Sequence, residues 1–210
     1  MAHRRTRGPG AQHEERRRQI ADAVLAIVAD RGLAAVSLSE VAAQAGISPG
    51  RVQHYFPAKR QLVEAAFERG NEQSSARIRR RVGQDLDAAE PRVVLVTVLT
   101  ELIPHDPATE AHMRVRQSFH ALAFAEEGIA ARLRVLYDGF HRQMADLIRA
   151  DQRAGRIAAA VDAGRSAPAL VALAEGLAAY VLIDVVPAGA ARERVLAAVD
   201  DLYRTTPSRS

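Results

Sequence analysis

Apolar residues recur along most of this chain at the spacing of an α-helix, three or four residues apart. Over residues 14–31, for example, Ile20, Val24, Ile27 and Val28 fall on one helical face. The same period returns in later segments, which are separated by glycine or proline residues of the kind that end helices. It predicts long helices over residues 58–82, 91–103, 108–126, 128–154, 164–185 and 189–204.

Two short helices are predicted between residues 31 and 58. Ser37–Glu40 has the S-x-x-E form of a capping box and opens a helix that Gly46 ends. Ser48-Pro49 places an N-cap before a proline in the first turn of the next helix, which Phe56-Pro57 closes. A helix, a glycine turn and a second short helix are typical of a helix-turn-helix. In total we expect about nine helices and an all-α fold.

Positive charge is concentrated in the first third of the chain. Residues 1–60 contain ten Lys/Arg and five Asp/Glu, a net +5, whereas residues 61–210 contain nineteen and twenty, a net −1. This distribution suits a module that binds a polyanion, although an Arg-rich tail without a partner is the alternative. We expect a flexible basic arm over residues 1–13, a helix-turn-helix domain over 14–60 and a larger helical domain over 61–210.

The residue types exclude several classes of protein. The sequence has no cysteine, so it can form neither a disulfide nor a thiolate metal site. The N-terminus lacks the apolar stretch of a secretory signal, and Glu175 and Asp184 interrupt the longest apolar segment. The common catalytic motifs and zinc-like histidine spacings are missing as well. We therefore expect a cytoplasmic protein that is not an enzyme and has no cofactor, metal or membrane association.

Residues 37–62 carry the most specific pattern in the chain. They contain a small hydroxyl residue, an apolar residue followed by Ala, the segment Ala45–Ser48, then Gly50 and a hydrophobe. An aromatic-rich stretch ending in Phe56 follows, and after it come Lys59 and a leucine. This order resembles the DNA-binding signature of the tetracycline-repressor (TetR) family of transcriptional regulators, and the match covers about residues 15–65.

The resemblance implies that residues 48–56 form a recognition helix that enters the major groove of DNA. Arg51 could reach guanine and Gln53 adenine, while Lys59, the only lysine in the chain, would contact phosphate. Gln53 and Tyr55 stand where the family more often has Tyr and His, so the division between base and phosphate contacts stays open. A solvated polar face is the alternative interpretation. The candidate DNA-binding residues are Ser37, Ser48, Pro49, Gly50, Arg51, Gln53, His54, Tyr55 and Lys59.

The last two long helices are the predicted dimer contact. Residues 167–182 are apolar almost all round, which indicates burial on more than one side. In the TetR family the last two long helices pair with their copies in a second subunit. The resemblance therefore implies a homodimer on a palindromic operator, with burial inside one chain as the alternative. The candidate interface residues are Leu170, Leu173, Leu177, Tyr180, Val195, Leu196, Val199 and Leu202.

Two stripes in the central helices are candidates for an effector site, which the resemblance places in the larger domain. They combine apolar and polar side chains at helical spacing, as small-ligand sites do, although an ordinary core would give the same pattern. This part has a general likeness to TetR effector domains, including choline-responsive ones, that does not identify a ligand. The candidate residues are Met113, Arg116, Gln117, His120, Phe124, Tyr137, Phe140, His141 and Met144.

Together these features predict a ligand-responsive regulator, a repressor that binds double-stranded DNA as a homodimer. A small apolar or amphipathic effector would release it from the operator. Two alternatives stay open: a DNA-binding regulator whose larger domain binds a protein partner or no effector, and an all-α interaction protein without specific DNA binding.

Overall fold

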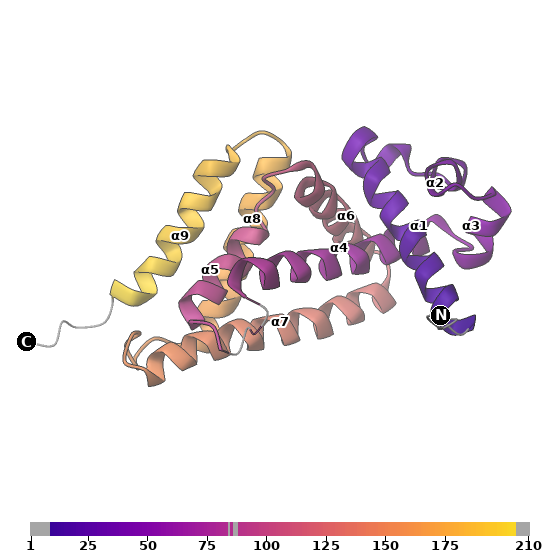
Figure 1. Ribbon diagram of the computed structural model, residues 1–210. Helices are drawn as coiled ribbons and strands as arrows, with labels where there is room; N and C mark the ends of the chain where they lie inside the picture. Colours follow the sequence, from indigo (N-terminus) through magenta and orange to yellow (C-terminus); the bar gives the residue numbers. More distant parts are fainter. Residues whose placement is uncertain (1–8, 84, 86–87, 205–210) are drawn as a thin grey trace, which may run out of the picture.

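The computed structural model describes residues 9–83, 85 and 88–204, and this part of the chain is helical without any strand. Figure 1 shows a small N-terminal part, residues 9–58, beside a larger part, residues 59–204. We call them the head and the body. Apart from α1, the ends of the long helices lie within three residues of their predicted positions. The elements are α1 (Pro9–Arg31), η1 (Leu33–Ala35), α2 (Leu38–Ala45), α3 (Pro49–Tyr55), α4 (Lys59–Val82), α5 (Pro91–Glu101), α6 (Pro107–Ala123), α7 (Glu127–Arg153), α8 (Ala163–Leu182) and α9 (Ala188–Arg204).

The first helix starts at Pro9, five residues earlier than predicted. The expectation of a flexible arm is therefore wrong for residues 9–13, while residues 1–8 lie outside the described residues. A Gly-Pro-Gly sequence usually indicates a loop, but proline is also tolerated in the first turn of a helix. The added residues contact the rest of the head, because the ring of His13 lies 4.8 Å from the ring of Tyr55.

The head is held together by an apolar core centred on α1. Ile20 and Val24 of α1, Val41 of α2, Val52 of α3 and the adjoining Phe56 all have 0% exposure. α2 and α3 contain only eight and seven residues, too few to be stable in isolation. Their helical form therefore depends on packing against α1.

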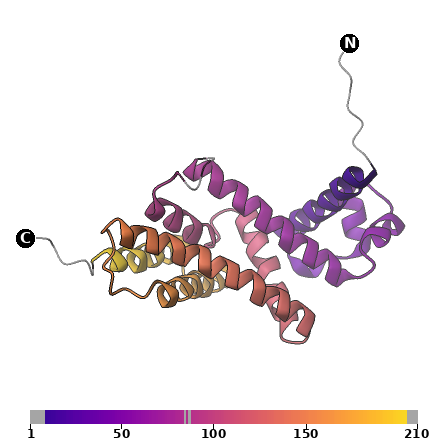
Figure 2. The same ribbon diagram turned by 90° about the horizontal axis from the view of Figure 1, so that it is seen from below.

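The body is organised around two long helices, α4 and α7, which run along the molecule, with α4 continuing up to the head (Figure 2). A second apolar core joins α5, α7, α8 and α9, and Leu99, Met144, Ile148, Ala174 and Val199 are fully buried in it. This core fixes the helices that surround the far half of α4.

The cores of the head and of its neighbouring helices form one continuous cluster. Phe67 of α4 stacks on Phe119 of α6 with ring centroids 4.5 Å apart, and both belong to the apolar cluster that contains Phe56. On the surface, Arg132 of α7 pairs with Glu68 of α4 at 2.5 Å. The head is thus seated on α4 and α6, and α7 is tied to α4 beside it, so a change in the packing of α4 and α6 can reach the head.

α8 is the most apolar helix of the body. By length and composition alone it is apolar enough to cross a membrane, but here it packs against α7 and α9. Glu175, midway along it, is ion-paired to Arg116 of α6. The side of α8 turned away from the body leaves Leu173, Tyr180 and Ile183 exposed at 36%, 52% and 66%. α8 is therefore a core helix with one uncovered apolar side.

Candidate nucleic-acid interface and ligand cavity

The turn between α2 and α3 is built by two serine caps and one glycine. The Oγ of Ser37 accepts a hydrogen bond from the amide of Glu40 (3.2 Å), and the Oγ of Ser48 accepts one from the amide of Arg51 (3.3 Å). Gly46 has a φ of 64°, in the left-handed region that glycine enters without strain. These features confirm the predicted caps and turn. The predicted capping box is incomplete, because the Glu40 carboxylate pairs with an arginine of α1.

The outward side of α3 is polar, and at its centre Gly50 has no side chain. Val52 is fully buried and marks the inward side of the helix. At about 100° per residue, Gly50 and His54 lie on the opposite side, with Arg51 and Gln53 flanking them. All four are exposed, and nothing lies within 4 Å of the position that a Cβ atom of Gly50 would take. A large partner could therefore approach the α3 backbone closely at Gly50.

The far end of α3 is tied to α1 by Arg17. Its Nη1 donates a hydrogen bond to the carbonyl of Tyr55 at 3.1 Å, and its guanidinium carbon lies 4.4 Å from the centre of the Phe56 ring. Tyr55 is consequently half-buried beside α1 rather than fully exposed with the other polar residues of α3. Arg17 was not among the predicted site residues, because its role depends on a contact across 38 residues of sequence.

The beginning of α4 adds positive charge next to α3. Lys59 is exposed, and within the described residues no hydrogen bond or ion pair engages it, whereas the adjacent Arg60 pairs with Glu126. Between residues 41 and 63 the sequence contains no Asp or Glu. This surface can thus attract an anion without an internal competitor.

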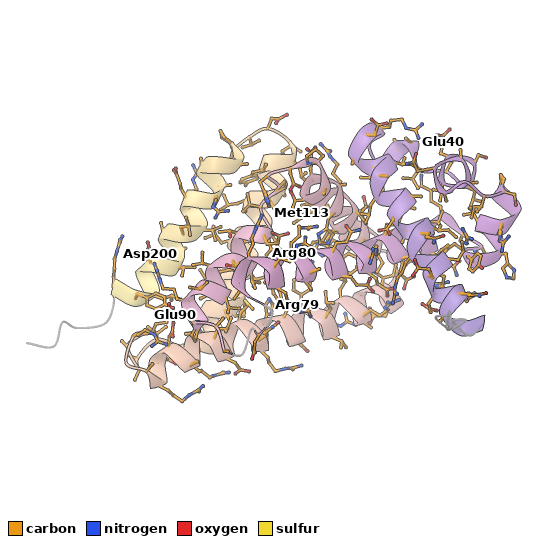
Figure 3. The ribbon with its side chains drawn as sticks, in the orientation of Figure 1. Glu40, Arg79, Arg80, Glu90, Met113 and Asp200 are labelled. Carbon is orange, nitrogen blue, oxygen red and sulfur yellow. The ribbon has the colours of Figure 1, made fainter. Side chains whose placement is uncertain are left out.

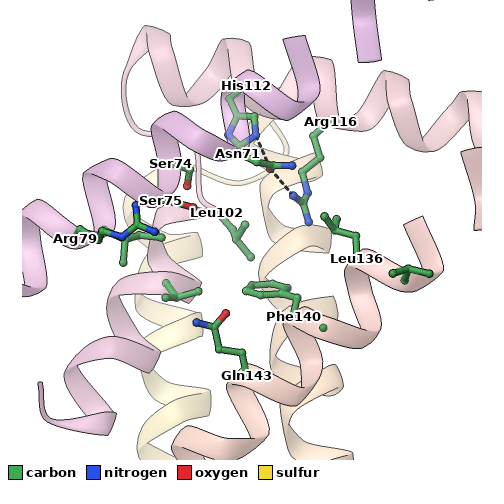
Figure 4. Close-up of a pocket in the computed structure, with 14 residues that line it drawn as sticks. Asn71, Ser74, Ser75, Arg79, Leu102, His112, Arg116, Leu136, Phe140 and Gln143 are labelled. Atoms are coloured by element: carbon green, nitrogen blue, oxygen red, sulfur yellow. Dashed lines mark hydrogen bonds between the residues drawn. The ribbon is translucent and has the colours of Figure 1, made fainter. Parts of the chain in front are cut away.

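A cavity of about 470 Å³ opens in the body among α4, α5, α6 and α7 (Figure 4). Its volume lies in the range of small-molecule sites. α4 contributes most of the polar side chains and α7 half of the apolar ones. The lining residues are Asn71, Ser74, Ser75, Ile78, Arg79, Val98, Leu102, His112, Arg116, Val135, Leu136, Gly139, Phe140 and Gln143.

One end of the cavity is closed by a buried polar network around Arg116, which is 4% exposed. The guanidinium donates to Glu175 Oε1 through Nε (3.0 Å) and Nη2 (2.5 Å), and to Asn71 Oδ1 through Nη1 (3.3 Å). The Tyr137 hydroxyl donates to Glu175 and lies 3.0 Å from His120 Nε2. Burial is the largest single influence on Arg116 and lowers its pKa, but Glu175 and Tyr137 together outweigh burial and raise the pKa of Arg116.

α4 and α6 touch closely beside this network. A Cβ atom on Gly70 would lie 2.1 Å from the His112 ring, so only glycine fits there. His112 Nε2 is 3.1 Å from Asn71 Oδ1, the oxygen that also accepts from Arg116. Burial, together with the charges of Arg116 and Arg77, lowers the pKa of His112 to about 3, so this side chain is neutral at pH 7. Asn71 therefore links α4 to two residues of α6 at the cavity wall.

Two family models match the chain. One, described as bacterial regulatory proteins of the tetR family, matches residues 20–66. The other, described as the C-terminal part of a BetI-type transcriptional repressor, matches residues 91–204, which is more than half of the chain. The chain belongs to the TetR family of transcriptional regulators.

Individual TetR relatives agree with this assignment. The regulator PksA of Bacillus subtilis is 29% identical over 82% of this chain and 81% of its own length. BetI of Rhizobium meliloti is 33% identical over 56% of this chain, which spans about half of BetI (49%).

Solved structures agree in fold. One described as a TetR-family regulator from Rhodococcus sp. is 28% identical with a TM-score of 0.75, covering 90% of this chain and 99% of its own. A transcriptional regulator from Saccharomonospora viridis in complex with choline shares the fold at 24% identity and a TM-score of 0.73, covering 91% and 97%.

In this TetR protein the candidate DNA-binding residues all lie in one stretch from the start of α2 to the start of α4. Ser37 and Ser48 cap helices and Pro49 occupies the first turn of α3, so their roles in the structure are to shape the turn. The side chains that remain exposed on α3 and at the start of α4 are Arg51, Gln53, His54 and Lys59.

The candidate effector residues separate into four groups. Only Arg116 and Phe140 line the cavity, while His120 and Tyr137 belong to the network behind its wall. Phe124 lies just beyond the end of α6 and is 93% exposed, because α6 stops at Ala123 rather than at residue 126. The prediction that Phe124 faces the effector site is therefore wrong. The remaining candidates are the buried core residues Met113 and Met144 and the half-buried Gln117 and His141, none of which lines the cavity.

The sequence interpretation missed the contribution of α4 to the cavity. Asn71, Ser75 and Arg79 stand four residues apart on α4, with Ser74 next to Ser75, and this periodic polar stripe is the sequence signal that could have indicated the contribution. On an amphipathic helix, however, a polar stripe usually faces water.

The candidate dimer residues are divided between core and surface. Leu170 and Leu177 of α8 and Val195 and Val199 of α9 are buried inside the single chain. The prediction that these four residues form the dimer contact is therefore wrong, since α9 packs its apolar side against α5 and α8 of the same chain. Leu173 and Tyr180 are exposed, and Leu196 and Leu202 are half-buried. Among the described residues, no group of three His, Asp or Glu side chains is placed to hold a metal ion.

Proposed function

We propose that this TetR-family protein is a repressor that binds a palindromic operator as a homodimer and leaves it when a small molecule fills the cavity. The observation that carries this proposal is that α4 belongs to both sites. Lys59 opens α4 beside the exposed surface of α3, and Asn71 and Arg79 farther along it line the cavity. We place the protein in the cytoplasm and assign it no catalytic activity.

The α3 surface supplies the proposed contacts to DNA. Gly50 lets the backbone approach the floor of the major groove, and His54, which lies on the same side, points toward the bases. Arg51 and Gln53 reach base edges on either side, while Lys59 binds phosphate as a point charge. The sequence alone left open whether His54 contacts phosphate or a base. The burial of Val52 favours a base contact, because it turns His54 directly outward.

The uncovered side of α8 supplies the proposed dimer contact. Leu173 and Tyr180 are seven residues apart and therefore share one face of α8, and the exposed Ile183 follows directly after the last residue of this helix. Gly176 lies between them and would let two copies of α8 approach closely. A two-fold dimer formed in this way would match a palindromic operator.

Release from DNA follows from contacts that an occupant of the cavity would make on two packed helices. It would touch Asn71 on α4 and His112 and Arg116 on α6, next to the close contact at Gly70. A molecule that binds one arrangement of α4 and α6 more tightly would shift the head toward the matching arrangement. The complex of a related fold with choline supports the idea that such a body can hold a small molecule.

The test starts with selection of bound sequences from a random duplex pool by the purified full-length protein. We expect a palindromic motif. Arg51→Ala should relax base preference at one position of each half-site, at a cost of roughly 1–3 kcal/mol. Lys59→Ala is the matched control on the same surface. It should weaken binding to all DNA sequences alike and reduce the slope of log affinity against log salt concentration by about one. Folded protein that selects no motif would contradict the proposal, as would unchanged specificity of Arg51→Ala.

A further inference from the structure

One positive charge at the cavity has no partner among the described residues. Among the described residues that line it, Arg79 and Arg116 are cationic and none is Asp or Glu. Arg116 is neutralised by Glu175, which stands outside the lining. No hydrogen bond or ion pair engages Arg79 anywhere in the described part of the chain, and its side chain is open to solvent. The lining therefore has one uncompensated positive charge.

Most of the polar side chains of the lining are on α4, whereas most of the apolar ones are on or next to α5 and α7. Ser74 and Ser75 lie on α4 one turn before Arg79, and their hydroxyls can donate hydrogen bonds to an acceptor held there. α7 contributes Leu136 and Phe140, which Figure 4 shows across the cavity from the α4 side chains. A molecule with one acceptor end and one apolar end would satisfy both sides.

We propose that the effector is a small amphipathic anion, a carboxylate with an apolar body. Its carboxylate pairs with Arg79 and accepts from the α4 serines, and its apolar part packs against Phe140 and Leu136. Arginine suits this role because its planar guanidinium can donate two parallel hydrogen bonds to a carboxylate. This inference rests on the proposed function of the cavity as the effector site.

A quaternary ammonium ion such as choline is a poor match for the same lining. Such cations are held by several aromatic faces or by a carboxylate. Phe140 is the one Phe, Tyr or Trp among the described lining residues. The nearby Glu175 already accepts from Arg116 and Tyr137, so a cation would have to compete with both. The cavity should therefore discriminate by the sign of the ligand's charge.

The experiment measures direct binding by calorimetry to the full-length protein without DNA. The probes are octanoate, 1-octanol and octyltrimethylammonium, which share an eight-carbon chain and differ in charge, together with choline. We expect octanoate to bind about tenfold more tightly than octanol, the gain of one charge-assisted ion pair at a partly exposed site. Neither cation should bind measurably.

Two neighbouring arginines provide matched variants. Arg79→Gln should weaken octanoate binding about tenfold and leave octanol binding unchanged, because only the ion pair is lost. Arg80→Gln is the control, since Arg80 is the next residue of α4 (Figure 3), is also exposed and is not among the residues that line the cavity. Arg79→Glu should reverse the preference, so that octyltrimethylammonium binds more tightly than octanoate.

Three results would overturn the inference: octanol or a cation binding as tightly as octanoate, an equal loss in Arg80→Gln, or no binding of octanoate by the folded protein. A separate readout tests the proposed function. If octanoate binds through Arg79 but leaves operator affinity unchanged in fluorescence anisotropy, the ligand class stands and the effector role of the cavity fails.

Discussion

The head and the body differ in what they bury. Every buried side chain in the described part of the head is apolar, whereas the body also buries Ser74, Thr100, Glu101, Thr109, His112, Arg116 and Asp151. The described core of the head therefore holds no buried charge whose partner could be changed. A buried charge depends on a particular partner, so its surroundings respond to whatever changes that partner. The comparison suggests that the body, rather than the head, is the part whose packing an effector can change.

Among the variants that test this difference, Glu175→Gln should have the largest effect on stability. It leaves the Arg116 guanidinium buried without a negative partner, and removal of one member of a buried pair costs about 3–5 kcal/mol. We expect that loss in the free energy of unfolding measured by urea denaturation. The control is Glu126→Gln, which breaks an exposed pair with Arg60 and should cost less than about 1 kcal/mol. Equal losses in the two variants would erase the distinction between buried and surface charge.

Gly70→Ala probes the close contact between α4 and α6. The added methyl group would collide with the His112 ring, and overpacking of this kind costs roughly 1–3 kcal/mol. Gly128→Ala is the matched control, because nothing lies within 4 Å of a Cβ there. Combining Gly70→Ala with His112→Ala should recover part of the loss, as a thermal or urea unfolding cycle would show. If the double variant is only additive, the contact is not the cause.

The smallest expected effect is a pH dependence of stability in the body. The pKa of His112 is about 3 in the folded protein and about 6.5 when unfolded, so only the unfolded state takes up this proton between those values. Stability is then present above about pH 6.5 and declines as the pH falls, by up to about 1.4 kcal/mol per pH unit. His112→Gln should remove this part of the slope in urea titrations between pH 6.5 and 5.5. The two proteins should have parallel slopes between pH 7.5 and 8.5, and a shared slope at acid pH would refute the assignment.

The head and the body also differ in how much of each could be predicted from the sequence. In the head, the chemistry that shapes the site is local: Ser37, Gly46 and Ser48 act on backbone groups within a few residues, so a linear pattern reveals them. In the body, Arg116 meets Glu175 across 59 residues and Asn71 across 45. No periodicity indicates such pairings, and a polar residue on a helix is read as solvated by default.

The apolar pattern of α9 has a related ambiguity. Its helical period identifies Val195 and Val199 as one buried face, which they are, with 0% exposure. The period does not say whether the covering helix belongs to the same chain or to a second copy. Here α5 and α8 of the same chain cover it. For the same reason α8, with apolar residues on nearly all sides, could be predicted to have two partners but not to have one of its sides exposed.

The position of Gly70 gives α4 a mechanical property. Gly70 is 11 residues after Lys59 and 12 before Val82, so the closest contact of the helix lies near its midpoint. A rod of 24 residues is about 36 Å long, and one that pivots at its centre is a lever with equal arms. If the C-terminal half of α4, which lines the cavity, moved in one direction, the Lys59 end would move in the opposite direction by a similar distance. Arg79 lies nine residues after Gly70, a slightly shorter arm than the 11 residues to Lys59, so a displacement of Arg79 would reach the DNA-binding end of α4 with a small increase in size.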